Sequence, residues 1–239
     1  MGQSRRAANR KTAPASIAAK RTAPRSAGKR NNGAREAVIL LSGFEPFAGE
    51  PRNPSREVAR ALDGELIAGL RVRALELPVI YAKAARLMSG AIARVRPAAV
   101  LGLGQAGGRT VITLERIAIN LLDGPRSDNA GRRKTDEPVV RGGPDAYFAR
   151  LPLRDIVQAL KRRRIPAALS LSAGAFICNA VMYAALHELR RRPHLPCGFI
   201  HLPYDTRQAI RHLSAPSMPV EMMIDAVRTA IAKIGESLV

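Results

Sequence analysis

Short apolar runs separated by helical segments, from residue 37 onward, constrain the fold of this chain more than any other feature of its sequence. Residues 37–41 and 98–103 are apolar almost throughout, and the second run lies between Pro97 and Gly104, as a buried strand does. Segments with helical spacing, such as 82–95, lie between such runs. Strands that alternate with helices of about ten to fifteen residues form βαβ units. The pattern therefore predicts an α/β fold with a mainly parallel sheet that helices cover on both faces.

The remaining elements follow the same alternation. We expect strands at 37–41, 71–77, 98–103, 167–171 and 198–202, with β-rich segments within 111–122. We expect helices at 56–62, 82–95, 153–163, 178–192 and 220–234. Residues 123–146 are rich in Gly, Pro, Asp, Asn and Arg and read as a long loop. Loops of this length in a compact domain are often functional.

Positive charge is concentrated at the amino terminus. The chain has 39 Lys and Arg against 19 Asp and Glu, a formal charge of +20, and residues 1–35 hold ten of the basic residues and no acidic one. This segment has almost no large apolar side chain, so it cannot offset the entropy of ordering, and we predict a disordered basic extension. Residues 36–239 are then expected to form one moderately basic globular domain.

The role of the extension stays open. An incidental solvated extension is the simplest interpretation. Weak, nonspecific contact with nucleic acid or another anionic surface is a second. A targeting segment is a third, because the extension is rich in Arg and Ser and free of acidic residues.

Cysteine use and hydropathy indicate a cytoplasmic protein. Cys178 and Cys197 are too few for a disulfide framework and do not form a CxxC pair, which favours a reduced, intracellular setting. No segment approaches the roughly 18 apolar residues that span a bilayer, and the amino terminus lacks the apolar core of a signal peptide. We therefore expect no membrane insertion. No His, Cys, Asp or Glu cluster has metal-ligand spacing, and we expect no metal or other cofactor.

Cys178 is the sharpest candidate for catalysis. It follows a turn of small residues, 172–175, and precedes a helical run, so it should lie near a helix amino terminus. Free amides at such a position stabilise a thiolate and lower the thiol pKa. From position alone, a buried structural cysteine is the more frequent alternative. Cys197 lies within an expected strand after Pro196, and we interpret it as core.

A thiol nucleophile needs a base, commonly histidine. His201 ends an expected strand at the edge where parallel sheets present catalytic groups. Glu115 could orient that base, although a carboxylate beside Arg116 is more often one half of an ion pair. The glycine-rich segment 102–109 follows a strand but matches no phosphate-binding motif, so a tight turn whose amides approach a substrate is favoured.

These motifs together resemble the pyroglutamyl peptidase I (pyrrolidone-carboxylate peptidase) family of cysteine peptidases. The resemblance covers roughly residues 37–239, in the order expected. The segments that carry it are GFEPFAGEPRNPS (43–55), GLGQAGGRTVITLERIAINLLD (102–123), GGPDAYFARLP (142–152), LSAGAFICNAVMYAALH (171–187) and GFIHLP (198–203).

The resemblance implies a fold, an activity and an assembly. The fold is a three-layer α/β/α sandwich, phosphorylase/hydrolase-like, with a mainly parallel, partly mixed sheet. The activity is that of a thiol exopeptidase that removes an N-terminal pyroglutamyl (5-oxoprolyl) residue from peptides through a thioester. Cys178 matches the nucleophile, His201 the general base and Glu115 the residue that orients it. A homotetramer is implied as well.

The resemblance also assigns the substrate pocket. Phe44 and Phe47 match aromatic residues that sandwich the lactam ring, and Phe176 and Ile177 match the apolar wall beside the cysteine. The remaining matches are Asn53, which shapes the first loop, and Gln105, a substrate-binding residue that follows the expected strand 98–103.

The sequence departs from the family pattern at one position near the expected site. After the Leu-Asp that corresponds to 122–123 the family usually has an Arg, then Ile or a similar residue and Pro-Asp-Asn, whereas here the run is GPRSDN (124–129), so that Arg126 comes one position late. Ala48 in place of a Gly is a milder change. Whether Arg126 takes over the role of the displaced Arg is left open.

Two other hypotheses remain from the sequence. A catalytically weak relative would bind pyroglutamyl peptides without efficient turnover, as the shifted Arg126 suggests. A nucleic-acid-associated protein would act through basic charge, with affinity that falls steeply as salt increases.

Overall fold

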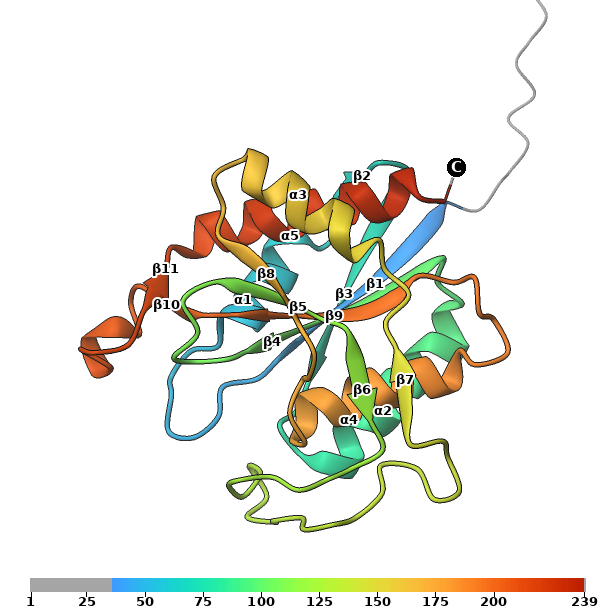
Figure 1. Cartoon of the computed structure of the whole chain (residues 1–239), viewed down its shortest axis with the longest axis vertical. Helices are drawn as coiled ribbons and strands as arrows, with labels where there is room; N and C mark the ends of the chain where they lie inside the picture. Colours follow the sequence, from blue (N-terminus) through green and yellow to red (C-terminus); the bar gives the residue numbers. More distant parts are fainter. Residues whose placement is uncertain (1–35, 239) are drawn as a thin grey trace, which may run out of the picture. The chain divides into compact units, whose positions relative to one another are not determined.

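Seven strands form the central sheet of the computed structural model, which describes residues 36–238 (Figure 1). Their order across the sheet is β2-β3-β1-β4-β9-β5-β8. Their bounds are β1 Ala37–Phe44, β2 Leu66–Ile67, β3 Leu70–Leu77, β4 Ala99–Gln105, β5 Ile112–Glu115, β8 Ala167–Ser170 and β9 Cys197–Leu202.

The sheet is mainly parallel and partly mixed, as predicted. Strands β3, β1, β4 and β9 run in the same direction. Strand β5 is antiparallel to β9 and parallel to β8, while β2 pairs antiparallel with β3 at the far edge. The strand direction therefore reverses between β9 and β5, so that these two neighbouring strands run in opposite directions.

Helices cover both faces of the sheet, so the prediction of a three-layer sandwich is confirmed (Figure 1). Helices α1, α3 and α5 pack over one face, and α2 and α4 over the other. Their bounds are α1 Pro54–Leu62, α2 Tyr81–Val95, α3 Leu153–Arg162, α4 Ile177–Glu188 and α5 Val220–Glu236. The core is largely aliphatic, with Leu, Ile, Val and Ala predominating in both layers.

Of the short pieces outside the main sheet, the strand Ile117–Ile119 falls within the expected β-rich region 111–122, and the others were not predicted. Strands β6 (Ile117–Ile119) and β7 (Ala146–Phe148) pair with each other, as do β10 (Tyr204–Asp205) and β11 (Ser217–Met218). A single 3₁₀ turn, Ala209–Arg211, lies between β10 and β11. Pieces of two or three residues depend on partners distant in sequence, so local patterns do not indicate them.

Two expected boundaries can be compared directly with the structure. Between β6 and β7 there is no named helix or strand, only a bridge from Leu122 to Glu137, so the long loop is confirmed. The expectation that the helix after Cys178 reaches residue 192 is wrong, because α4 ends at Glu188. Pro193 disfavours helical geometry in the residue before it, and three consecutive arginines (190–192) give the last turn like charges to repel.

The start of α1 fixes the first loop at the end of β1. Asn53 is the N-cap: its Oδ1 accepts from the Ser55 amide at 3.1 Å, and Pro54 occupies the first helical position. Ser55 Oγ in turn accepts from the Phe44 amide at 3.0 Å. A Cβ on Gly43 would lie 2.2 Å from the Ser55 carbonyl oxygen, so only glycine lets α1 approach β1 this closely.

The described residues form one compact unit. The predicted disorder of residues 1–35 concerns a segment outside the described residues. Within 36–238, none of the helices has the length and apolar character needed to cross a bilayer.

Candidate active site

The carboxyl ends of β1, β4 and β9 open at one edge of the sheet, where parallel sheets place their ligands. Phe44 ends β1, Gln105 ends β4, and His201 lies one residue before the end of β9. Cys178, the second residue of α4, comes to this edge from the helical layer. Four segments that are far apart in sequence therefore meet here.

The register between β5 and β9 brings Glu115 to His201. Thr113 pairs with His201, and Glu115 pairs with Phe199 in the antiparallel ladder. Alternate residues of a strand point to the same face, so all four side chains lie on one face of the sheet. Phe199 packs in the apolar cluster with α2 and α4, which identifies that face as the one covered by α4.

Glu115 and His201 form a buried hydrogen-bonded pair. The distance from His201 Nδ1 to Glu115 Oε1 is 2.8 Å, and the exposed fractions of the residues are 4% and 0%. A carboxylate only accepts hydrogen bonds, so Nδ1 carries the proton and donates. A neutral imidazole in this tautomer has an unprotonated Nε2, which is the acceptor that a general base needs.

The same carboxylate oxygen accepts two further hydrogen bonds. Arg109 Nη1 donates to Glu115 Oε1 at 2.6 Å, and Thr113 Oγ1 donates to it at 3.1 Å. Arg109 also contacts the Thr113 hydroxyl. Burial on its own would raise the pKa of Glu115, but the hydrogen bond and charge of His201, with the hydrogen bond from Arg109, hold that pKa below its usual range. Glu115 is therefore ionised and held in one orientation.

Two glycines on β4, which carry no side chain, leave space for the Cys178 sulfur. A Cβ on Gly104 would lie 2.8 Å from Cys178 Sγ and 2.9 Å from the Phe199 ring. Gly102 is closer still to that ring, with a built Cβ at 2.4 Å. Gly104 pairs with His201 in the parallel ladder, so the sulfur lies over the strand position beside the imidazole. These glycines serve close packing, and the interpretation of segment 102–109 as a phosphate loop has no support in this geometry.

The thiol pKa differs from the sequence-based expectation. Burial, together with the charge of Glu115, raises the pKa of Cys178 to about 12, although Arg109 and the amide of Cys178 itself act in the opposite direction. The helix amino terminus therefore does not produce a resting thiolate on its own. In this geometry the thiol can lose its proton only when a base takes it up.

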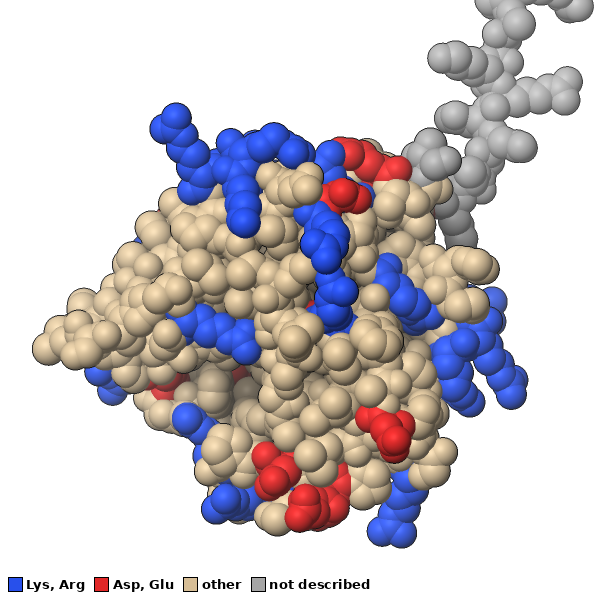
Figure 2. All heavy atoms as spheres, in the orientation of Figure 1, with Lys and Arg blue, Asp and Glu red and all other residues tan. Residues whose placement is uncertain are grey.

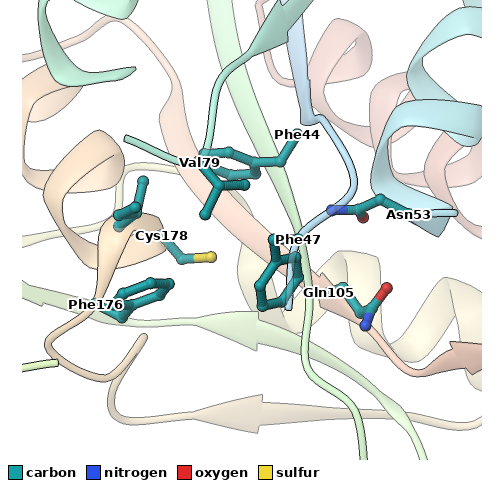
Figure 3. Close-up of a pocket in the computed structure, with 8 residues that line it drawn as sticks. Phe44, Phe47, Asn53, Val79, Gln105, Phe176 and Cys178 are labelled. Atoms are coloured by element: carbon teal, nitrogen blue, oxygen red, sulfur yellow. The ribbon is translucent and has the colours of Figure 1, made fainter. Parts of the chain in front are cut away.

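An apolar chamber opens beside the sulfur (Figure 3). The Cys178 sulfur points between Phe47 and Phe176, with Phe44 and Val79 beside them. The two amide side chains in the lining are Asn53 and Gln105, on the side opposite Phe176. The full lining is Phe44, Phe47, Asn53, Val79, Gln105, Phe176, Ile177 and Cys178. Six of the seven residues predicted to bind substrate thus surround one cavity with the predicted nucleophile.

A second, more polar chamber of about 750 Å³ adjoins the first. The two chambers share Phe47, Gln105, Phe176 and Cys178. The second is also lined by groups that the first lacks: His201, Arg109, Arg126, Tyr204, Pro125, Ala106, Gly107, Ala173 and Gly174. Cys178 therefore lies at the junction, with the apolar chamber on one side and the imidazole on the other. The displaced Arg126 reaches the same chamber as the imidazole.

The departure from the family pattern after Asp123 has a local packing counterpart. A Cβ on Gly124 would lie 2.0 Å from the Tyr81 hydroxyl oxygen and 2.7 Å from the Phe176 ring. The loop that follows is tied to the site by Asn129, whose Nδ2 donates to Glu45 Oε1 at 2.9 Å. Through Asn129, the long loop is therefore hydrogen-bonded to the first loop.

Sequence reasoning missed several residues that shape the site. Arg109, Thr113, Val79 and Tyr204 were not singled out, yet Arg109 and Thr113 hold Glu115, and Val79 and Tyr204 line the chambers. Thr113 could have been found, because it lies two residues before Glu115 on the same strand face. Tyr204 had no local signal.

Cys197 and His187 lie apart from this arrangement, whereas the His212 ring stacks on Tyr204 at the second chamber. Burial raises the pKa of Cys197 to about 12, and its side chain packs in the core, as predicted. His187 Nδ1 is 2.8 Å from the Tyr147 hydroxyl, and His212 Nε2 is 2.6 Å from Glu50 Oε1. Among residues 36–238, no three His, Cys, Asp or Glu side chains are grouped as a metal site would require.

Comparison with known proteins gives one consistent match. The family model described as pyroglutamyl peptidase matches residues 37–237. A pyrrolidone-carboxylate peptidase of Klebsiella pneumoniae is 47% identical over 196 residues, which is 82% of this chain and 92% of that protein. One from Chromobacterium violaceum is 50% identical over 194 residues, 81% of this chain and 90% of that protein.

Solved structures agree with the sequence matches. A mutant pyrrolidone carboxyl peptidase from the hyperthermophile Pyrococcus furiosus is 40% identical with a TM-score of 0.82, covering 84% of this chain and 100% of that one. Pyroglutamyl peptidase I of Bacillus amyloliquefaciens is 37% identical with a TM-score of 0.81, covering 84% of this chain and 98% of that one.

Proposed function

Since the chain belongs to the pyroglutamyl peptidase family, we propose that it hydrolyses the bond between an N-terminal pyroglutamyl residue and the rest of a peptide. Cys178 is the nucleophile, His201 the general base and Glu115 the residue that orients His201. The observation that carries the proposal is the position of Cys178, at the junction between an apolar chamber and the chamber lined by His201.

Acylation begins with proton transfer. His201 Nε2 takes the thiol proton while the sulfur attacks the pyroglutamyl carbonyl carbon, and the carbonyl π electrons move onto oxygen. The tetrahedral intermediate collapses, the C–N bond breaks, and the leaving amine takes the proton from His201. The products are the shortened peptide and a thioester on Cys178.

Deacylation repeats the sequence with water. His201 accepts a proton from water, hydroxide oxygen adds to the thioester carbonyl, and the C–S bond breaks as the sulfur regains a proton. Free pyroglutamate leaves, and the enzyme returns to its starting state. The raised pKa of Cys178 makes the base necessary in the first half of this cycle.

Helix α4 supplies the group that stabilises developing negative charge. The first hydrogen bond of its ladder runs from the Ala180 amide to the Phe176 carbonyl oxygen at 3.1 Å, so the amides of residues 177–179 precede the ladder. Amides at a helix amino terminus favour an anion. The Cys178 amide, next to the reacting sulfur, is the donor we assign to the oxyanion.

The apolar chamber explains the choice of substrate. Pyroglutamate is an uncharged lactam, and Phe44, Phe47 and Phe176 offer it aromatic surface. An ordinary N-terminal residue carries an ammonium group, and burial of that charge without a partner is costly. The chamber therefore selects peptides whose amino terminus is blocked by cyclisation.

A matched set of arylamides tests this proposal. Pyroglutamyl, prolyl and glutaminyl arylamides share the leaving group and differ in the amino-terminal group. We expect arylamine release from the pyroglutamyl compound and a rate at least about 100-fold lower for prolyl arylamide, whose ring is similar in size but charged. Equal rates for the two ring compounds would exclude this assignment of the chamber.

The second candidate function is binding of pyroglutamyl peptides with little turnover. Its basis is the position of Arg126, one residue later than in the family pattern. Because Arg126 lines the same chamber as Cys178 and His201, the shift does not remove it from the site. Tight binding of pyroglutamate by a folded protein that releases no arylamine would favour this candidate.

A nucleic-acid function receives little support from the face of the molecule shown in Figure 2. On the face shown in Figure 2, Lys and Arg side chains are scattered and interspersed with acidic ones, rather than gathered in one stripe. A duplex-binding surface presents clustered basic side chains to the phosphates. Weak anionic contacts through residues 1–35 remain a proposal, to be tested by deletion of that segment.

We also propose a cytoplasmic location and assembly of identical copies, a tetramer by family resemblance. Catalysis needs the reduced thiol of Cys178, which a reducing compartment maintains. Exposed apolar side chains, including Ile210 at 79% and Leu213 at 91%, give the chain surface that an assembly can cover. Sedimentation analysis of the purified protein measures the assembly state.

A further inference from the structure

Gln208 is a buried amide outside all the segments that carry the family resemblance. It lies in the arm between β10 and β11, and only 1% of its surface is exposed. Its side chain contacts Gln105, the amide that lines both chambers at the end of β4. The orientation of these two amides decides whether the substrate meets an N–H donor or a C=O acceptor.

Three contacts fix the orientation of the Gln208 amide. Its Oε1 accepts from the backbone N–H of Asp205 at 3.1 Å, and a backbone N–H can only donate. Its Nε2 faces the Arg52 carbonyl oxygen at 3.4 Å and Glu50 Oε2 at 3.2 Å. Both of these are acceptors, so the reverse orientation of Gln208 would place like groups together at each contact.

Glu50 is ionised, which strengthens this assignment. Burial on its own would raise the pKa of Glu50, but hydrogen bonds from His212 and Gln208 hold it below its usual range. A carboxylate has no proton to donate. The group that faces Glu50 Oε2 must therefore be the NH₂ of Gln208.

Gln208 in turn fixes the orientation of Gln105. Gln208 Nε2 donates to Gln105 Oε1 at 3.1 Å. Reversal of the Gln105 amide would place its NH₂ against the NH₂ of Gln208, two donors without an acceptor. With Oε1 bound in this way, Gln105 Nε2 has no hydrogen-bond partner among the described residues, and the side chain lines both chambers.

We infer that Gln208 is a positioning residue: it orients Gln105 so that Nε2 donates a hydrogen bond to a carbonyl oxygen of the pyroglutamyl group. This inference rests on the proposed function. The other amide in the apolar chamber, that of Asn53, supports the same conclusion. Asn53 Oδ1 already accepts from the amide and hydroxyl of Ser55, and its Nδ2 donates to the Glu45 carbonyl oxygen at 3.0 Å, so Asn53 too has only N–H left to offer. A chamber with these donors selects a ligand that carries carbonyl oxygens.

A double-mutant cycle separates orientation from general loosening of the arm. Gln208→Met keeps the length of the side chain and removes its donor. We expect kcat/KM for pyroglutamyl arylamide to fall about fivefold, the usual net effect of one hydrogen bond. In a Gln105→Leu background the same change should cost less than about twofold, because there is no amide left to orient. Arg211→Ala is the matched control, since it removes another tie of the arm, to the Gly49 carbonyl oxygen at 3.1 Å, and should leave kcat/KM unchanged.

Gln105→Glu tests the orientation without disturbing Gln208. The carboxylate still accepts from Gln208 but offers the chamber an oxygen in place of N–H. We expect kcat/KM to fall at least about tenfold, more than one neutral hydrogen bond alone, because an acceptor then faces an acceptor. Retention of activity in this variant would overturn the inference.

Inhibition by 2-pyrrolidone, a lactam without the acyl carbonyl, identifies the oxygen that is bound. A rise in Ki in Gln208→Met assigns the ring carbonyl, and an unchanged Ki with a lower kcat assigns the acyl carbonyl. An unchanged kcat/KM in Gln208→Met, or an equal loss in both backgrounds, contradicts the inference. If the wild-type protein itself releases no arylamine, the proposed function fails, and calorimetric binding of 2-pyrrolidone to the same variants still tests the orientation of Gln105.

Discussion

The sulfur of Cys178 occupies the space that a side chain at Gly104 would fill. A Cβ built on Gly104 lies 2.8 Å from that sulfur, closer than the two atoms can approach. The thiol can therefore lie over β4, beside the strand that carries His201, only because residue 104 is glycine.

Gly104→Ala should displace the sulfur and reduce kcat by about 100-fold, since a shift of about 1 Å at a reacting atom has effects of this size. Gly90→Ala in α2 is the control, because a Cβ there meets nothing within 4 Å and alanine is the better helix former. Steady-state kinetics and thermal unfolding of both variants check the prediction. A fully active Gly104→Ala enzyme would show that the sulfur does not need this position.

Cys178 and Cys197 should differ in reactivity. Both thiols have raised pKa values of about 12, but only Cys178 lines a chamber shared with a base. We expect iodoacetamide to modify Cys178 and abolish turnover, and Cys197 to remain unmodified in the folded protein. Peptide mapping after partial alkylation measures both.

Serine substitutions provide the matched test of the two cysteines. Cys178→Ser should abolish arylamine release, whereas Cys197→Ser should retain most of it at the cost of some stability in the core. Substantial turnover in Cys178→Ser would show that Cys178 is not the nucleophile.

Removal of the Glu115 carboxylate should change both activity and the pH dependence of stability. The pKa of Glu115 is lowered in the folded protein, against a usual value of 4.5. The group therefore stabilises the fold above that value, and this contribution is lost as pH falls through the folded-state pKa. Urea unfolding of the wild type should show this loss below about pH 4.5, and Glu115→Gln should show a shallower decrease.

Glu115→Gln should also lower kcat by about 100-fold or more, because the base loses its charged partner. Glu65→Gln is the control, since Glu65 pairs with Arg228 far from the site and its carboxylate is exposed to solvent. If Glu115→Gln kept the wild-type kcat and the same loss of stability in acid, Glu115 would be excluded as the residue that orients His201.

Alanine substitutions of Phe47 and Phe44 should differ in their effect on the stability of the fold. Phe47 is partly exposed at the chamber wall, whereas Phe44 is buried and its ring centroid lies 6.5 Å from that of Phe199. Phe47→Ala should raise the Ki of 2-pyrrolidone about tenfold with little change in thermal stability. Phe44→Ala should in addition destabilise the fold by about 3–5 kcal/mol. An unchanged Ki in Phe47→Ala would exclude the aromatic sandwich.

The fold and the candidate site residues were inferred from the sequence for different reasons. Apolar runs such as 98–103 indicate buried strands by themselves, so the parallel core followed from the pattern alone. The pairing of His201 with Glu115, and the position of Cys178 in the chamber that His201 lines, depend on strand order, and only the family resemblance linked these three residues. Position alone favoured a structural role for Cys178.

The features that the sequence did not indicate depend on contacts between distant segments. The pairing of Gln208 with Gln105 joins residues 103 positions apart. The raised pKa of Cys178 has the same origin, since burial by the packed layers outweighs the local effect of the helix amino terminus. Local sequence patterns contain no information on such contacts.

Trapping of the acyl-enzyme tests the central claim most directly. The protein is mixed with excess pyroglutamyl arylamide, quenched in acid within the first turnovers, and digested for mass spectrometry. The account predicts a mass increase of one pyroglutamyl group on the peptide that contains Cys178, absent from Cys178→Ser. Arylamine release at full rate without any adduct on Cys178 would contradict it.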